Sequence, residues 1–170
     1  MSKDKVRVAG VVHDSITDGP GLRFVIFTQG CCHRCKGCHN PHTWDFDAGE
    51  EETSESLLAE IDRNPLIKGI TLSGGEPFLQ SKALIPFAKE VKARGFDIAA
   101  YSGFLFSDLC ADEEKRELLE LCDVLVDGKF DVSKQSLECK FKGSENQRVI
   151  DVKKSLKSGK VVLVKNGGWV

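Results

Sequence analysis

Four of the chain's seven cysteines lie within eight residues, in the stretch GCCHRCKGCHNP from Gly30 to Pro41. Cys31, Cys35 and Cys38 form a CxxxCxxC pattern, and replacing Cys31 by Cys32 gives a CxxCxxC alternative, so spacing alone leaves both open. In a reducing cytosol, clustered cysteines are metal ligands or redox groups more often than disulfides. The stretch therefore predicts a metal or redox centre.

The number of available ligands bears on which metal binds. A structural zinc site is closed by four ligands, commonly two CxxC-type pairs separated along the chain, and the sequence has no second pair. Zinc would have to recruit Cys32 or one of His33, His39 and His42, which are otherwise expected to be surface or hydrogen-bonding residues. Three thiolates without a clear fourth ligand suit an iron–sulfur cluster with one iron open to a substrate. An open iron implies chemistry.

Further candidate residues follow predicted strands. SGGEP, from Ser73 to Pro77, comes after the apolar run GITL. Its glycines allow backbone to approach a ligand, and the Glu76 carboxylate can accept a hydrogen bond from an ammonium group. Ser102 in YSG, and Asp127 and Lys129 in DGK, lie where later strands end. Ligands bind at the carboxyl ends of parallel strands, so these residues are expected to line a pocket, with solvated turns as the alternative.

The elements that position these residues alternate between strands and helices. The predicted strands are residues 22–28, 69–72, 96–102, 123–130 and 160–165, and the predicted helices are residues 53–64, 81–95 and 112–121. Such alternation favours a parallel sheet. A complete eightfold barrel takes roughly 250 residues, so 170 residues predict an α/β fold that is a partial, open β/α barrel or an open sheet. An open side would leave room for a partner.

Composition narrows the class of protein. The 24 basic and 26 acidic residues give a net charge of −2, which predicts no nucleic-acid partner. MSKDKVRVAG at the start has no apolar stretch of the signal-peptide kind, and no apolar run approaches the roughly 18 residues of a membrane span. We therefore expect a single cytoplasmic domain over residues 1–170 that binds no membrane. The scattered Cys110, Cys122 and Cys139 are expected to be packing residues.

Together, the CxxxCxxC loop after a strand and the SGGEP stretch resemble the signatures of the radical S-adenosylmethionine (SAM) superfamily. The resemblance implies the partial, open barrel of that superfamily, with parallel strands and outer helices. It also implies that Cys31, Cys35 and Cys38 hold a 4Fe-4S cluster whose fourth iron is chelated by SAM. Many members carry an aromatic residue where this chain has Gly37. The implied SAM contacts are Gly37, His39, Gly74, Gly75, Glu76, Ser102, Asp127 and Lys129.

A longer stretch, DSITDGPGLRFVIFTQGC, resembles the N-terminal segment of the glycyl-radical activating enzymes, a subgroup of this superfamily. CxGCHN, AYSG and FKGSENQRVIDVKKSL, residues 141–156, are most similar to the activators of anaerobic ribonucleoside-triphosphate reductase. HNPHTWD is also similar to the pyruvate formate-lyase activators, which are the alternative. The resemblance extends from about Val11 to Leu156, nearly the whole chain.

The resemblance implies an oxidoreductase that cleaves SAM reductively to methionine and a 5'-deoxyadenosyl radical. This radical would take a hydrogen from a glycine α-carbon of the anaerobic reductase. The implied partners are that reductase, whose glycine loop would contact Asp18, Gly19 and Arg23, and a low-potential electron donor such as flavodoxin or ferredoxin. From other classes, a zinc-stabilised binding module or an iron–sulfur electron carrier would also explain the cysteines.

Overall fold

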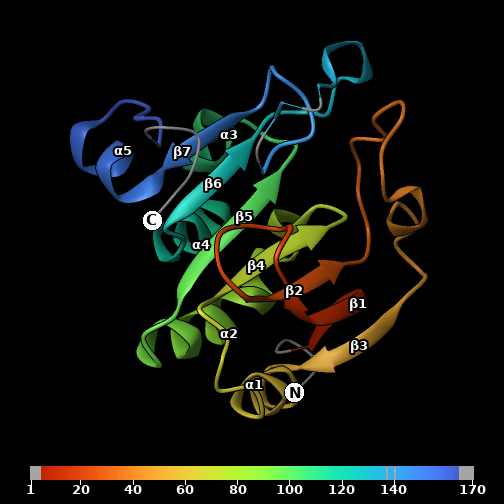
Figure 1. The fold of residues 1–170 in the computed structure, drawn as a ribbon, viewed down its shortest axis with the longest axis vertical. Helices are drawn as coiled ribbons and strands as arrows, with labels where there is room; N and C mark the ends of the chain where they lie inside the picture. The colour runs from red at the N-terminus through yellow and green to blue at the C-terminus, as the bar shows by residue number, and fades with distance from the viewer. Residues whose placement is uncertain (1–4, 137, 140, 165–170) are drawn as a thin grey trace.

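The computed structural model describes residues 5–136, 138–139 and 141–164 (Figure 1). Its centre is a seven-stranded sheet in the order β3-β1-β2-β4-β5-β6-β7. The strands are β1 Lys5–Ser15, β2 Arg23–Thr28, β3 Glu50–Thr53, β4 Gly69–Gly74, β5 Asp97–Ser102, β6 Val124–Asp127 and β7 Arg148–Asp151. Strands β2, β4, β5 and β6 are parallel, whereas β1, β3 and β7 pair antiparallel. The sheet is open, with β3 and β7 at its edges.

The helices follow the strands in the βα rhythm. They are α1 Ser54–Asp62, α2 Ser81–Ala93, α3 Phe106–Ala111, α4 Glu113–Leu121 and α5 Val152–Ser158, with short 3-10 turns η2 Pro41–Thr43, η3 Pro77–Gln80 and η4 Val132–Lys134. Local signals set the start of α1, where Thr53 Oγ1 accepts from Ser56 N at 3.0 Å and Ser56 Oγ accepts from Thr53 N at 3.2 Å. This capping box satisfies donors that a helix start leaves unpaired.

The two faces of the sheet differ. Successive strand side chains point to opposite faces, so Ile70 and Leu72 of β4 join the main core with Leu84 of α2. Ser73, between them and the strand end, lines a cavity on the opposite face. Figure 1 shows α2 and α4 behind β4 and β5, so the helices cover one face and leave the other to loops.

Most of the predicted elements are confirmed. The predicted helices at 53–64, 81–95 and 112–121 correspond to α1, α2 and α4, and four predicted strands correspond to β2, β4, β5 and β6. The last of these is shorter than expected and ends at Asp127. The parallel core of the sheet is confirmed, and the antiparallel edges were not predicted.

The predicted strand at 160–165 is wrong over its described part. Residues 160–164 form one isolated bridge, Leu163 to Ile150, and Lys165 lies outside the described residues. The reason is that β7 already pairs with the free edge of β6. The segment instead follows the outer side of β7 through backbone bonds from Asp151 N to Val162 O and from Val164 N to Val149 O.

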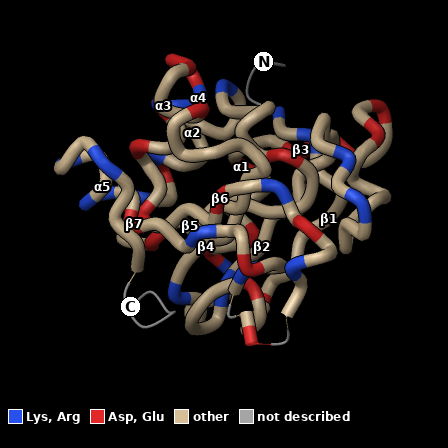
Figure 2. The backbone as a smooth tube through the Cα atoms, turned by 90° about the horizontal axis from the view of Figure 1, so that it is seen from above, with Lys and Arg blue, Asp and Glu red and all other residues tan. Residues whose placement is uncertain are grey.

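Charge is spread over the molecule. Lysine and arginine segments alternate with aspartate and glutamate segments around the view of Figure 2 and do not collect on one side of it. None of the helices in the described residues has both the length and the apolar composition that crossing a membrane requires.

Candidate metal and cofactor site

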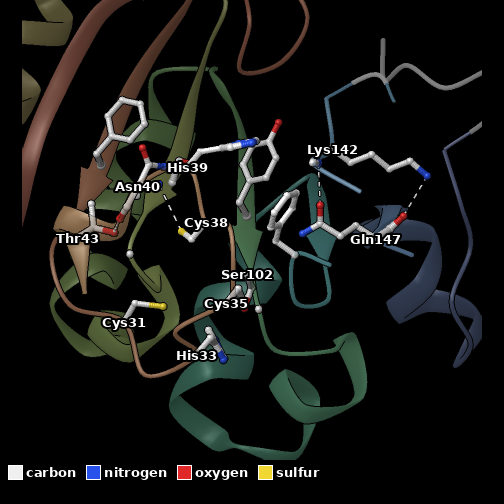
Figure 3. A pocket seen from close by; sticks show the side chains of 18 of the residues that line it. Cys31, His33, Cys35, Cys38, His39, Asn40, Thr43, Ser102, Lys142 and Gln147 are labelled. Atoms are coloured by element: carbon white, nitrogen blue, oxygen red, sulfur yellow. Dashed lines mark hydrogen bonds between the residues drawn. The ribbon is translucent and has the colours of Figure 1, made fainter. Parts of the chain in front are cut away.

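A cavity of about 400 Å³ opens on the face of the sheet that the helices leave uncovered (Figure 3). Its wall includes Cys31, Cys35 and Cys38 together with Ser73 and Tyr101 from the ends of β4 and β5. The parallel strands therefore end where the cysteine loop begins, as expected for a ligand site in an α/β fold.

The structure distinguishes between the two cysteine patterns. Cys31, Cys35 and Cys38 share the cavity, whereas Cys32 is exposed and is not part of its wall. This arrangement favours CxxxCxxC. Among the described residues, no three His, Cys, Asp or Glu side chains converge closely enough to hold a single metal ion.

Backbone amides surround the cysteine sulfurs. Burial raises the pKa of the Cys31 thiol, and hydrogen bonds from the backbone N–H groups of His33 and Arg34 partly oppose this. Asn40 N donates to Cys38 Sγ at 3.4 Å. Donors of this kind stabilise a thiolate and tune an iron–sulfur cluster.

Cys35 lies beside the segment that follows β6. Burial raises the pKa of its thiol, while a hydrogen bond from the Phe130 backbone and the nearby charge of Lys129 act to lower it. Lys129 is exposed and is not in the cavity wall. Its proximity to Cys35 places it at the edge of the site, and its contact with SAM stays a prediction.

The predicted Gly-Gly-Glu turn joins β4 to the start of the cysteine loop. Gly75 N donates to Thr28 O at 2.7 Å, and Glu76 N donates to Gly30 O at 2.9 Å. A Cβ at Gly74 would lie 2.4 Å from Thr28 N, and one at Gly75 would lie 2.4 Å from Gly30 O. Both glycines are therefore required by the close approach of the two backbones.

The Glu76 side chain lies behind the cavity wall. It is 0% exposed and accepts from Gly103 N at 2.8 Å and Phe78 N at 3.0 Å. The Ser102 hydroxyl lies 2.9 and 3.0 Å from its two oxygens, and His33 Nε2 lies 2.7 Å from Oε1. Ser102, Gly103 and His33 line the cavity, whereas Glu76 does not. The predicted contact between Glu76 and the SAM amino group thus remains a prediction.

Asp127 has a supporting position at the end of β6. Its buried carboxylate accepts from Phe106 N, at the start of α3, at 2.8 Å and from Arg148 Nε at 2.9 Å. The residue is not in the cavity wall. Its predicted contact with SAM is untested, and the observed bonds fix α3 and β7 to the strand end.

The cysteine loop carries two more predicted contacts. His39 lines the cavity, where its ring is tilted against Phe130 at 5.1 Å and its Nε2 lies 3.4 Å from Gln135 Nε2. Gly37 lies outside the wall with φ +78°, and a Cβ added at Gly37 would lie only 3.0 Å from Val132. Its left-handed backbone and close packing explain why glycine replaces a larger residue there.

The N-terminal turn expected to meet a partner lies at another side of the cavity. Asp18 lines the wall, and its backbone oxygen accepts from Thr71 Oγ1 at 2.8 Å. Arg23 is 0% exposed and pairs with Asp97. The partner contact predicted for Asp18, Gly19 and Arg23 stays a prediction, and the burial of Arg23 places it beneath this turn.

Sequence reasoning assigned no role to the far wall of the cavity. Phe141, Lys142, Gly143 and Gln147 form this wall, and Figure 3 shows Lys142 and Gln147 across from the cysteine loop. Tyr101 Oη donates to Phe141 O at 2.6 Å, and Gln147 Oε1 accepts from Gly143 N at 2.8 Å. The stretch FKGSENQR contributed to the family resemblance, but nothing in its local sequence predicts that it lies against the end of β5.

Two observations test whether the cavity fits a cluster and its ligand. The donor set is three thiols with amide donors around them, which is the chemistry of iron–sulfur ligation. Trp44 also lines the cavity, and its buried indole Nε1 has no acceptor among the described residues. A buried donor without a partner is costly, and a bound group could supply the acceptor. The residues present therefore fit the implied cofactors.

The open, parallel-rich sheet, the thiol trio after β2 and the Gly-Gly-Glu turn after β4 define a radical SAM protein. The family described as "4Fe-4S single cluster domain" matches residues 17–150. QueE from Escherichia coli has a similar fold, with a TM-score of 0.50 at 20% identity over 58% of this chain and 52% of that one.

Curated relatives give the narrower family. The anaerobic ribonucleoside-triphosphate reductase-activating protein of Pasteurella multocida is 36% identical over 140 residues, which cover 78% of this chain and 89% of the relative. The protein of that name from Enterobacteria phage T4 is 36% identical, with 78% and 85% covered. A pyruvate formate-lyase-activating enzyme of Listeria monocytogenes is 37% identical, with 70% and 52% covered. The chain belongs to the family of anaerobic ribonucleoside-triphosphate reductase-activating proteins.

Proposed function

We propose that this chain is a glycyl-radical activating enzyme whose partner is anaerobic ribonucleoside-triphosphate reductase. Cys31, Cys35 and Cys38 would hold a 4Fe-4S cluster, and SAM would bind in the adjoining cavity. When bound, these cofactors would supply one-electron reductive cleavage of SAM to methionine and a 5'-deoxyadenosyl radical, which would take a hydrogen from a glycine of the reductase. The observation that carries the proposal is the meeting of three thiols and the Gly-Gly-Glu turn at one cavity.

The chain's own residues would bind and orient SAM. The proposed contacts in the cavity wall are His39, Gly74, Gly75 and Ser102; those outside it are Gly37, Glu76, Asp127 and Lys129. Gly74 and Gly75 present backbone without side chains, so a ligand can approach the strand end closely. Holding the reacting groups in one geometry is the protein's main contribution when the cofactor supplies the reactivity.

The cavity is open, and we propose that the reductase's glycine loop closes it near Asp18 and Gly19. A glycine suits the reaction because its α-carbon carries no side chain and its backbone can adopt unusual conformations in a narrow site. A low-potential donor such as flavodoxin or ferredoxin would reduce the cluster. We further propose a single domain over residues 1–170, placed in the cytoplasm.

Activation of pyruvate formate-lyase is the second candidate, because HNPHTWD resembles that type and one such relative is 37% identical. That relative is about twice as long as the matched region, since only 52% of it is covered. The reductase activators are covered to 85–89%. Matching length therefore favours the reductase as partner.

The first test is electron paramagnetic resonance of the anaerobically reconstituted, reduced protein with and without SAM. A 4Fe-4S signal that changes on adding SAM is expected, because SAM would occupy the open iron. An unchanged signal would indicate an electron carrier, and bound zinc without iron would indicate a binding module. Adding either glycyl-radical enzyme then identifies the partner by which one acquires a glycyl-radical signal.

A further inference from the structure

The Glu76 carboxylate is saturated by donors from its own chain. Oε1 receives His33 Nε2 at 2.7 Å, Gly103 N at 2.8 Å and the Ser102 hydroxyl at 2.9 Å, and Oε2 receives Phe78 N at 3.0 Å. The Ser102 hydroxyl is also 3.0 Å from Oε2. An ionised carboxylate offers about four acceptor positions. A ligand's ammonium group would therefore have to displace one of these donors.

His33 lies between this carboxylate and the cavity. Its side chain is 6% exposed and lines the cavity, whereas that of Glu76 is 0% exposed and does not. The imidazole packs edge-to-face against Phe104 with ring centroids 4.6 Å apart. A Cβ at Gly103 would lie 2.4 Å from the imidazole. The contact with Phe104, the hydrogen bond to Glu76 and the space left by glycine at position 103 together fix the position of the imidazole ring.

The same residue belongs to the cysteine loop. His33 lies in the spacer between Cys31 and Cys35, next to Arg34, which has a left-handed backbone with φ +49°. The backbone of His33 and Arg34 lies beside the Cys31 sulfur. A left-handed conformation is unfavourable for arginine and needs support from its surroundings. Anchoring the imidazole on Glu76 supplies that support.

We propose that His33 is a positioning residue that ties the cysteine loop to the ends of β4 and β5 through Glu76. Glu76 then acts on the cluster through His33, in addition to its proposed contact with SAM. This inference rests on the proposed function for the identity of the cofactors. Iron release without SAM reports on this tie apart from the SAM contact, and a double-mutant cycle measures the coupling between the two residues.

The experiment compares His33→Ala, Glu76→Ala and the double variant, each reconstituted with the cluster, with His33→Gln as the conservative variant. His42→Ala is the control, since His42 is exposed and lies outside the cavity wall. Two quantities are measured: the rate of iron release to a chelator without SAM, and the SAM dissociation constant from the spectral change of the reduced cluster. The reduction potential without SAM is recorded as a third.

His33→Ala is expected to release iron about 10-fold faster, since a charge-assisted hydrogen bond is lost. Glu76→Ala is expected to be affected at least as much, because it also removes the acceptor of Ser102, Gly103 and Phe78. The double variant is expected to match Glu76→Ala, because His33 has no partner left to lose once the carboxylate is gone. His33→Gln keeps an N–H donor and is expected to restore the rate and the potential, which general loss of stability would not allow. Glu76→Ala is expected to weaken SAM binding more than His33→Ala, since it also removes a proposed SAM contact.

Additive effects on iron release, or a wild-type rate of iron release in His33→Ala, would overturn the proposal. Should His33→Ala fail to fold, His33→Leu keeps apolar volume against Phe104 and removes the hydrogen bond, and the same comparison applies. Failure of the proposed function would show separately, as no effect of SAM on the wild-type cluster. Amide exchange of residues 31–38 in cluster-free protein tests the His33–Glu76 tie even then, and unchanged exchange in His33→Ala would refute it.

Discussion

Replacing Asp97 by Asn is expected to destabilise the protein and to loosen the turn beside the cavity. Asp97 is the ion-pair partner of Arg23, whose side chain is 0% exposed. Arg23 also donates from Nε to Thr71 Oγ1 at 2.8 Å, from Nη2 to Ile70 O at 2.9 Å and from Nη1 to Pro20 O at 3.3 Å. The guanidinium therefore connects β4 and β5 with the start of the N-terminal turn.

The magnitude follows from the burial of the two partners. Removing one partner of a fully buried ion pair costs about 3–5 kcal/mol. The Asp97 side chain is 31% exposed, and asparagine can still accept a hydrogen bond, so we expect a loss of about 2 kcal/mol in the free energy of unfolding. At about 2–4 °C per kcal/mol for a domain of this size, Tm is expected to fall by about 4–8 °C.

Thermal unfolding followed by circular dichroism measures the change, and Asp62→Asn is the matched control. Asp62 pairs with Arg94 at 3.0 Å, but its side chain is 54% exposed, so this substitution is expected to leave Tm unchanged. Equal effects of the two substitutions would refute the reasoning from burial. In the functional assay, Asp97→Asn is expected to reduce glycyl-radical formation in the partner more than SAM cleavage without it, because the affected turn lies on the side of the cavity proposed to meet the partner.

Three further predictions test the site and the core. Cys31→Ala is expected to abolish the iron–sulfur absorption of reconstituted protein while Cys32→Ala retains it, and the reverse would move the ligand set to CxxCxxC. Burial raises the pKa of Cys122 to about 12, so an alkylating reagent at about pH 8 is expected to label Cys32 in the folded protein and Cys122 only after unfolding; mass spectrometry showing equal labelling would contradict this. Gly75→Ala is expected to prevent cluster retention, because its Cβ would meet Gly30 O at 2.4 Å, while Gly10→Ala, with open space around it, is expected to behave as wild type in the same absorption assay.

The central part of the fold was predictable because its signals are local. Strands buried on both sides in a parallel sheet are continuous apolar runs, and RFVIFT of β2 has that character. Helix α1 is indicated by Thr53 and by the helical spacing of Leu57, Leu58 and Ile61. These features need no knowledge of distant residues, so their prediction was confirmed.

The edge strands depend on pairing that no local pattern contains. Strand β3 is EEET, four residues with three glutamates, and it exists because it pairs with β1. Conversely, KVVLV at 160–164 has the composition of a strand, yet it forms only one isolated bridge, from Leu163 to Ile150 on the outer side of β7. β-propensity describes how well a side chain fits a pleated, half-buried surface. Which segment becomes a strand depends also on its pairing with the rest of the sheet.

In the site, too, some features were predictable from the local sequence and others depend on contacts between distant residues. The cysteines and the Gly-Gly-Glu turn were found from type and spacing, and the family resemblance assigned Cys31 rather than Cys32. The cavity wall contains Cys31 and not Cys32. The saturation of Glu76 by Ser102 and His33 could not be foreseen, because it arises only when the end of β5 and the cysteine loop meet at the end of β4. Sequence can name a carboxylate, but the number of its free acceptor positions is a property of the folded chain.

The open face of the sheet gives this arrangement its functional meaning. Helices cover one face, and the other presents Ser73 and Tyr101 to a cavity that this chain leaves open. A radical reaction requires water and competing groups to be kept from the reactive atom. On the proposed function, the enclosure is completed by the reductase at the side of Thr17 and Asp18. The same contact that presents the glycine would then also shield the radical, so SAM cleavage and glycine activation are expected to be most tightly coupled when the partner is bound.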